Sequence, residues 1–534
     1  MSRHILRTLV SLTLVAALGC DDDEAYTETD YTPSTVEDGL FYAPTALEQS
    51  EQHALVLDVS GQDPKTTAYP LPGGSVTTVS RPGSNGREVV VLTAGLEAVR
   101  TGQHKRAAVP SSVAIFGRTG ELVRKPLQGR YRSLSLSPDG RYGIAFGSSA
   151  GLSVDNSAEV IDFMSDAAPV FVDLSLDARA PSYFEFSPVG GFTHRIAVAP
   201  QPNALQILDL EHPERGAISI TLVAKSTQVP AQLVFSGDRM FVRSENSPSI
   251  VVLQAIEVAK GNHPWQLAPQ EHFASSVVRD IAVTGTGAAQ RLLALTGSLE
   301  VFDPAIGRTA KIDGVASFSR ILQFVGTSPI DSNAVSRAML YGTLEPARGV
   351  SSVSTSQVGF VDLGDETAWT TRNVEVVELG DTVMQMTAFT TRKIALARLN
   401  SGRAGVIDLQ ARTVRRLVLD EFNGGLLIDE AGGSPRLWAR GVDGALGRVD
   451  LDSFGRIELP MAFGPGPDAT WGGDPLNARA DMMVVPSQQH RRIAVLQRAR
   501  TGRVTFVDAD APSSESAADS ALEVLGIYLH DLLH

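Results

Sequence analysis

The residues that could carry out chemistry are scattered along this 534-residue chain rather than gathered in a motif. Eight of the ten histidines stand singly, and His530 and His534 are the one pair with ligand-like spacing. Such a pair at the end of a chain is more typical of a frayed tail than of a metal site. No P-loop and no H-E-x-x-H motif is present. Residues 147–151 match G-x-S-x-G, but LSVDN follows instead of the helix that this motif requires. We therefore assign no catalytic residue, metal ligand or cofactor, while a calcium site built from dispersed carboxylates stays open.

The single cysteine, Cys20, follows a short apolar run near the start of the chain. Two arginines precede the apolar stretch 9–18, which is the layout of an export signal. That stretch is shorter than the roughly 20 residues that span a bilayer. Ala17-Leu18-Gly19-Cys20 resembles a bacterial lipoprotein lipobox. The resemblance implies a lipoprotein signal peptide at residues 1–19, diacylglyceryl on the Cys20 sulfur, and acylation of the new N-terminus with a fatty acid such as palmitate.

Composition indicates a large, water-soluble body with negative charge. The chain is 43% hydrophobic, which suffices for a sizeable core at this length. Removal of residues 1–19 would take away two arginines, so that 44 basic residues oppose 60 acidic ones and the net charge moves from −14 to −16. An acidic surface repels phosphate backbones and anionic headgroups. We therefore expect no nucleic-acid partner and no direct electrostatic docking on a membrane.

Residues 20–39 are expected to form an acidic, flexible tether. The stretch 21–39, DDDEAYTETDYTPSTVEDG, has few apolar side chains to bury. Charge repulsion would extend it and hold the folded part, residues 40–534, a few nanometres from the lipid. The first repeat unit after the tether is expected to lack its innermost strand.

From about residue 40 a short phrase recurs, in which two or three apolar residues precede an aspartate. Two degenerate copies replace the aspartate with another residue. Successive markers lie 42 to 59 residues apart, and such a period indicates an internal repeat. The markers are Asp58, Gly117, Asp162, Asp209, Gln254, Asp303, Asp362, Asp408, Asp450 and Asp508.

Each unit contains four short β-prone runs separated by Gly, Pro, Asp and Ser. In the third unit these runs are 133–137, 142–146, 158–163 and 169–176, and the turn Pro138-Asp139-Gly140 separates the first two. The aspartate that closes the third run can accept hydrogen bonds from the amides of the following turn. Four antiparallel strands repeated in this way predict an all-β fold, a single β-propeller of four-stranded antiparallel blades.

The phrase Leu136-Ser137-Pro138-Asp139-Gly140-Arg141-Tyr142 resembles the strand–turn–strand of WD40-like, TolB-like and YVTN-type propeller proteins. As a pattern the resemblance covers most of residues 40–534, but it is strong in one unit. The Trp-Asp dipeptide, the YVTN string and a complete sialidase Asp-box are absent. The resemblance therefore implies an architecture and no particular activity.

We expect about eight blades, within a range of seven to ten. Ten markers allow ten blades, whereas seven or eight is usual, and some markers could lie outside the ring. The run 521–529 could be the outer strand of the last blade, or it could pair with the N-terminal unit to close the ring. Closure is expected because an open ring exposes two sheet edges.

Four long connections, at residues 95–112, 147–157, 343–357 and 462–481, are expected to emerge on one face of the ring. Long loops of compact domains are often functional, so this face is the predicted binding surface, although insertions without a partner are the alternative. The candidate partner-binding residues are Trp471, Arg348 and His104 on three of these connections. Trp471 is the preferred anchor because tryptophan is favoured at interaction hot spots.

The first functional hypothesis is a non-enzymatic binding or scaffold lipoprotein of a bacterial cell envelope, anchored in the membrane through Cys20. Its partner would be an unknown protein or polysaccharide. The anchor could lie in the outer membrane or on the periplasmic face of the inner membrane, and the cell surface is also open. The alternative is a propeller enzyme of the lactonase, quinoprotein or glycan-cleaving type, with a site in the central channel. A purely structural subunit of a large envelope assembly is the third possibility.

Overall fold

A computed structural model describes most of the chain after residue 30. The described residues are 31–44, 51–61, 64–96, 98–101, 104–148, 156–174, 181–222, 229–258, 263–285, 289–327, 334–344, 353, 355–363, 374–401, 403–417, 425–429, 436–440, 446–452, 456–459, 482–487, 491–496, 504–510 and 522–524.

These residues form ten four-stranded antiparallel sheets, and the strands of each sheet follow one another from the inner to the outer edge. The first sheet contains β1 (Tyr31–Val36), β2 (Gly39–Pro44), β3 (Glu51–Asp58) and β4 (Lys65–Pro72). The second contains β5 (Ser75–Ser80), β6 (Val89–Thr93), β9 (Ser112–Gly117) and β10 (Gly120–Pro126). The third contains β11 (Tyr131–Leu136), β12 (Tyr142–Ser148), β13 (Ser157–Asp162) and β14 (Val170–Asp173). The fourth contains β15 (Glu185–Phe186), β16 (Ile196–Gln201), β17 (Ala204–Asp209) and β18 (Ala217–Thr221). The fifth contains β19 (Pro230–Ser236), β20 (Arg239–Ser244), β21 (Ser249–Glu257) and β22 (Trp265–Phe273).

The other five sheets follow the same order. The sixth contains β23 (Asp280–Thr284), β24 (Arg291–Leu295), β25 (Leu299–Asp303) and β26 (Gly307–Ile312). The seventh contains β27 (Arg320–Thr327), β28 (Ala334–Tyr341), β29 (Gln357–Asp362) and β30 (Glu375–Glu378). The eighth contains β31 (Val383–Phe389), β32 (Ile394–Leu399), β33 (Ala404–Asp408) and β34 (Thr413–Leu417). The ninth contains β35 (Gly425–Asp429), β36 (Arg436–Arg440), β37 (Leu446–Asp450) and β38 (Arg456–Leu459). The tenth contains β39 (Met482–Val485), β40 (Arg492–Leu496), β41 (Val504–Asp508) and β42 (Leu522–Val524). A separate hairpin joins β7 (Val99–Thr101) to β8 (His104–Arg106), and the short 3-10 helices are η1 (Pro213–Arg215) and η4 (Thr390–Arg392).

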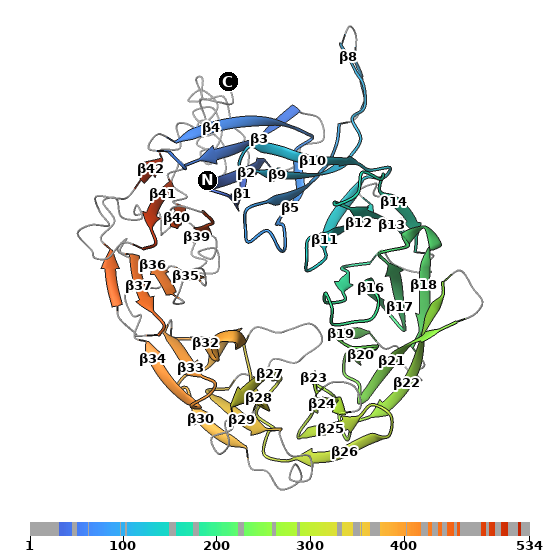
Figure 1. Ribbon diagram of the computed structural model, residues 1–534, viewed down its shortest axis with the longest axis vertical. Coiled ribbons are helices and arrows are strands. Elements are labelled where there is room, and N and C mark those ends of the chain that lie inside the picture. Colours follow the sequence, from blue (N-terminus) through green and yellow to red (C-terminus); the bar gives the residue numbers. More distant parts are fainter. Residues whose placement is uncertain are drawn as a thin grey trace, which may run out of the picture.

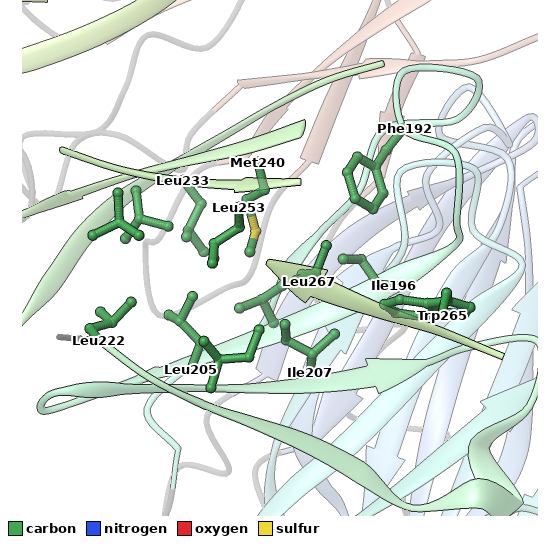
Figure 2. Close-up of a cluster of buried hydrophobic side chains, with 14 residues drawn as sticks. Phe192, Ile196, Leu205, Ile207, Leu222, Leu233, Met240, Leu253, Trp265 and Leu267 are labelled. Atoms are coloured by element: carbon green, nitrogen blue, oxygen red, sulfur yellow. The ribbon is translucent and has the colours of Figure 1, made fainter. Parts of the chain in front are cut away.

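The sheets stand around a central axis as the blades of a propeller (Figure 1). The all-β fold of four-stranded antiparallel blades is therefore as predicted, and ten sheets in the described residues lie at the upper end of the predicted range. Each interface between neighbouring blades encloses one cluster of buried apolar side chains. Between the fourth and fifth blades, Leu205 and Ile207 point toward Met240 and Leu253 (Figure 2). Each such fully buried side chain contributes about 1.5–3 kcal/mol.

The first and last blades close the ring without exchanging a strand. A cluster that includes Leu57 and Phe506 packs across this seam. The amide of Asp38 donates to the carbonyl of Pro486 at 2.8 Å. Of the two expectations for residues 521–529, the first is confirmed for the described residues 522–524, since β42 pairs with β41 as the outer strand of the last blade. Closure therefore depends on packing between sheets rather than on a shared sheet.

All ten repeat markers lie at or near the ends of third strands, one marker in each blade. Each of the eight aspartate markers is the last residue of its strand. Asp58 accepts a hydrogen bond from the amide of Ser60 at 2.8 Å, and Asp408 accepts two from the turn that follows it. Five other aspartate markers accept bonds of the same kind. The expected role of these aspartates as turn caps is confirmed, and it explains why the phrase recurs.

The first blade begins earlier than the sequence predicted. β1 lies inside the segment 20–39 that was expected to be a tether, and all six of its residues pair with β2. The first unit therefore does have its innermost strand. The polar, Thr-rich composition of β1 is tolerated because β2 supplies its hydrogen-bonding partner, and because Val36 is buried against the second blade. Residues 1–30, including Cys20, lie outside the described residues.

Candidate functional site

The antiparallel order of each blade sorts its connections between the two faces of the ring. Second-to-third and blade-to-blade connections emerge on one face, which we call the loop face. First-to-second and third-to-fourth turns emerge on the opposite face, which we call the turn face. The four long connections join β6 to β9, β12 to β13, β28 to β29 and β38 to β39. All four therefore belong to the loop face, as the sequence predicted.

One of the three predicted partner-binding residues lies in the part of the chain that the structure describes. His104 is the first residue of β8, while Arg348 and Trp471 lie outside the described residues. The binding role of all three candidates remains a prediction. The same is true of lipid attachment at Cys20 and of the pair formed by His530 and His534.

The connection between β6 and β9 forms a hairpin of its own. At its base, Leu96 and Val109 exchange both backbone hydrogen bonds at 2.9 Å, and Leu96 is buried. Beyond this bridge β7 pairs with β8, with Arg100 opposite Lys105. The hairpin projects beyond the outer strands of the ring, where β8 is labelled in Figure 1. It is the part of the loop face that reaches farthest from the blades in this view.

A buried carboxylate holds the loop face together in the third blade. Glu159 lies on β13 and is fully buried. One of its oxygens accepts hydrogen bonds from the amides of Gln128 and Gly129, at 2.7 and 2.8 Å, and from the hydroxyl of Tyr131 at 3.0 Å. These donors belong to the connection from β10 into β11. Glu159 therefore fixes the path by which the chain enters its blade.

Glu300 does the same in the sixth blade. Its side chain is buried and accepts bonds from both the amide and the hydroxyl of Ser275, in the connection from β22 to β23. Arg308 donates to its second oxygen at 3.1 Å. Burial disfavours the charged form of Glu300, but the hydrogen bonds from Ser275 and Arg308 outweigh it and hold the pKa below its ordinary value. The sequence signal for both glutamates is an acidic residue inside an otherwise apolar third strand.

Polar side chains also link the inner strands of the fifth, sixth and seventh blades near the loop face. Gln232 accepts from the amide of Ile281 and donates to its carbonyl, at 3.1 and 3.0 Å. Asp280 accepts from the amide of Ile321 at 2.7 Å. Burial raises the pKa of Asp280, and the hydrogen bond from the amide of Ile321 and the charge of Arg320 only partly offset this. Asp280 is buried on an innermost strand, where its carboxylate joins that strand to the innermost strand of the next blade.

Ion pairs join neighbouring blades at the turn face. Arg118 of the second blade pairs with Asp38 and Asp58 of the first, at 2.8 and 3.0 Å. Arg412 of the eighth blade pairs with Asp362 of the seventh at 2.5 Å. Burial alone would raise the pKa of Asp362, but the guanidinium of Arg412 outweighs it and lowers the pKa. These arginines and aspartates have partners in the fold, and we assign them to stability rather than to ligand binding.

An aromatic cluster lies on the same face between the fourth and fifth blades. The imidazole of His194 stacks on the indole of Trp265, with ring centroids 4.3 Å apart and planes 13° apart. The indole N–H donates to Asp209 at 3.3 Å. Burial lowers the pKa of His194, since it disfavours the imidazolium, while the charge of Asp209 acts in the opposite direction. The cluster seals the interface between two blades.

Among the described residues, no group of three or more His, Cys, Asp or Glu side chains is arranged to hold a metal ion. In the same part of the chain, no helix is both long and apolar enough to cross a bilayer.

Comparisons with known proteins show that this chain is similar to several solved structures. No protein-family model matches the sequence, and no curated protein matches it. Dihydro-heme d1 dehydrogenase NirN in complex with DHE is 17% identical over 66% of this chain and 71% of its own, with a TM-score of 0.41. Saccharomyces cerevisiae Sqt1 is 11% identical over 68% of this chain and 91% of its own, with a TM-score of 0.40. Apo AztD from Citrobacter koseri is 14% identical over 66% of this chain and 92% of its own, with a TM-score of 0.31. At these values the similarities assign no activity to the chain.

Proposed function

We propose that this protein is a lipid-anchored binding module of a bacterial cell envelope, and that its loop face takes a protein or polysaccharide partner. The observation that carries the proposal is the strand order, which gathers all four long connections on one face of a rigid ring. Loops set on a rigid scaffold are a common way to build a binding surface. The membrane anchor in this proposal is the lipid on Cys20.

The position of the first strand supports the same arrangement. β1 begins at Tyr31 on the loop face, because its first residue pairs with Pro44 at the end of β2. Ten residues, 21–30, separate Cys20 from Tyr31, which gives eleven residue-to-residue steps. Fully extended, they reach at most about 35–40 Å. The proposed tether would therefore keep the loop face close to the membrane, and a partner would be met there.

Site-specific photo-crosslinking in the cells that naturally produce this protein tests the binding surface. A photoreactive phenylalanine analogue is placed at Trp471 or Arg348 on the loop face, and at Met164 or Ile306 on the turn face as matched controls. The two control side chains are 72% and 80% exposed. We expect a discrete adduct from the loop-face positions alone. Adducts of equal yield from Met164 or Ile306, or none from the loop face, would count against the proposal.

Acylation is tested separately by Cys20→Ser. We expect the wild-type chain in the membrane fraction and the variant in the soluble fraction. Mass spectrometry of the wild-type N-terminus should show a lipid-modified Cys20. An unmodified N-terminus would refute the anchor while leaving the binding surface untouched.

A further inference from the structure

The hairpin formed by β7 and β8 projects beyond the outer strands of the ring (Figure 1), and its sequence is basic. Arg100, Lys105 and Arg106 lie on its two strands. No Asp or Glu occurs between Ala98 and Gly120. The whole chain has a net charge of −14, so this arm is a local reversal of sign. Because charges are screened within about 10 Å at moderate salt, the arm acts through its own charge and not through that of the ring.

The register of the hairpin adds a second observation. Arg100 and Lys105 are direct Cα partners across the two strands. Like charges placed opposite each other destabilise a strand pair, and an isolated two-stranded hairpin is marginal in water. The backbone bridge between Leu96 and Val109 fixes only the base of the arm. An anionic surface would remove this repulsion, so the arrangement suits a negatively charged binding partner.

The position of the arm indicates which anionic surface that is. It emerges from the loop face of the second blade, and β1, where the chain enters, belongs to the loop face of the neighbouring first blade. In the proposed arrangement, the chain between Cys20 and Tyr31 allows at most about 35–40 Å between the lipid and the start of β1. We propose that the β7–β8 hairpin binds the anionic headgroups of the membrane that carries the anchor. This inference rests on the proposed tether at Cys20, and it departs from the expectation, drawn from net charge alone, of no direct electrostatic docking on a membrane.

Vesicle co-sedimentation of the full chain with Cys20→Ser tests this without any contribution from the lipid anchor. The probes are vesicles of phosphatidylcholine alone and vesicles with roughly 30% phosphatidylglycerol. Each basic residue near an anionic surface strengthens partitioning by about fivefold. We therefore expect binding to the anionic vesicles only, reduced at least about tenfold by R100A/K105A/R106A. Raising NaCl from about 0.05 M to about 0.5 M should abolish it.

A matched control removes the same charge from elsewhere on the ring. Lys65, Lys311 and Arg416 are exposed basic residues on the outer strands β4, β26 and β34. K65A/K311A/R416A should bind anionic vesicles as the parent does, and thermal melting should show that both triple variants fold. Equal binding by the parent and R100A/K105A/R106A would overturn the proposal. Failure of the parent to bind anionic vesicles would also overturn the proposal. This holds even if the arm binds an acidic polypeptide instead. Neither of these vesicle-binding results depends on whether Cys20 is acylated in the cell. Acylation is decided separately, by the fractionation experiment on Cys20→Ser.

Discussion

Glu159 and Glu300 occupy the same position in two different blades, and each holds the chain segment that leads into its own blade. Each lies three residues before the aspartate that ends its third strand, Asp162 and Asp303. Both are fully buried, and both accept hydrogen bonds from backbone amides of the preceding blade-to-blade connection. A buried acceptor that is bonded in this way fixes the backbone of the blade-to-blade connection at the loop face.

Glu300→Gln should lower the free energy of unfolding by about 1–3 kcal/mol, because it removes the charge from a buried acceptor that takes hydrogen bonds from Ser275, Thr296 and Arg308. Urea denaturation measures this. Glu121→Gln is the matched control, since Glu121 is paired with Arg124 on the surface, where an ion pair contributes less than about 1 kcal/mol. Equal losses in the two variants would show that Glu300 has no special role.

Asp362→Asn should destabilise the fold at neutral pH, by roughly 1 kcal/mol for a partly exposed ion pair with Arg412. The folded-state pKa of Asp362 is depressed, so its stabilising contribution is present above the unfolded pKa of about 3.9 and is lost as pH falls through the folded pKa. The difference in stability between wild type and variant should therefore close below about pH 4. Urea titrations at neutral pH and at about pH 3 give the comparison, and a constant difference would contradict this account.

Asp280→Asn should show the opposite dependence on pH. The folded-state pKa of Asp280 is raised by burial, so the native state binds its proton more tightly than the unfolded chain does. Relative to the variant, the wild type should lose stability as pH rises from the unfolded pKa through the folded pKa. The asparagine side chain keeps an oxygen that can accept from the amide of Ile321. Unfolding measured from acid to neutral pH tests the sign, and a trend parallel to that of Asp362→Asn would exclude this reading.

Gly140→Ala should destabilise the turn between β11 and β12 by at least about 2 kcal/mol. Gly140 has a φ of 65°, and an added Cβ would lie 2.2 Å from the carbonyl oxygen of Pro82 in the second blade. The left-handed conformation alone costs about 1–2 kcal/mol for a residue with a Cβ. Gly297→Ala is the control, since a Cβ there meets nothing within 4 Å and needs no positive φ. Similar melting temperatures for the two variants would refute the close approach.

The repeat itself could be read from the sequence because it has a local cause. Asp58 and Asp408 each cap the turn that follows their own strand, so the same short phrase is needed wherever such a turn occurs. The shared face of the long connections followed in the same way from strand order. The innermost strand β1 could not be read in this way, because the polar segment 31–36 is a strand only when β2 pairs with it.

The buried acceptors at the loop face were missed for a related reason. Glu159 and Glu300 look like ordinary acidic residues until the connection from the preceding blade is brought against them. The two glutamates and their amide donors are about 25 to 30 residues apart in the sequence, and no local pattern joins them. The projecting hairpin shows the same limit, since its basic residues were visible but its position beyond the ring was not.

The sequence by itself determined the all-β class, the four-strand unit, the recurring turn caps and the faces on which connections emerge, because strand periodicity and turn chemistry act between residues close in the chain. The tertiary structure decided the number of blades, the closure of the seam by packing between Leu57 and Phe506, and the roles of Glu159, Asp280 and Glu300. Those features depend on which surfaces meet when distant segments pack, and burial energy acts on that geometry whatever the distance along the chain.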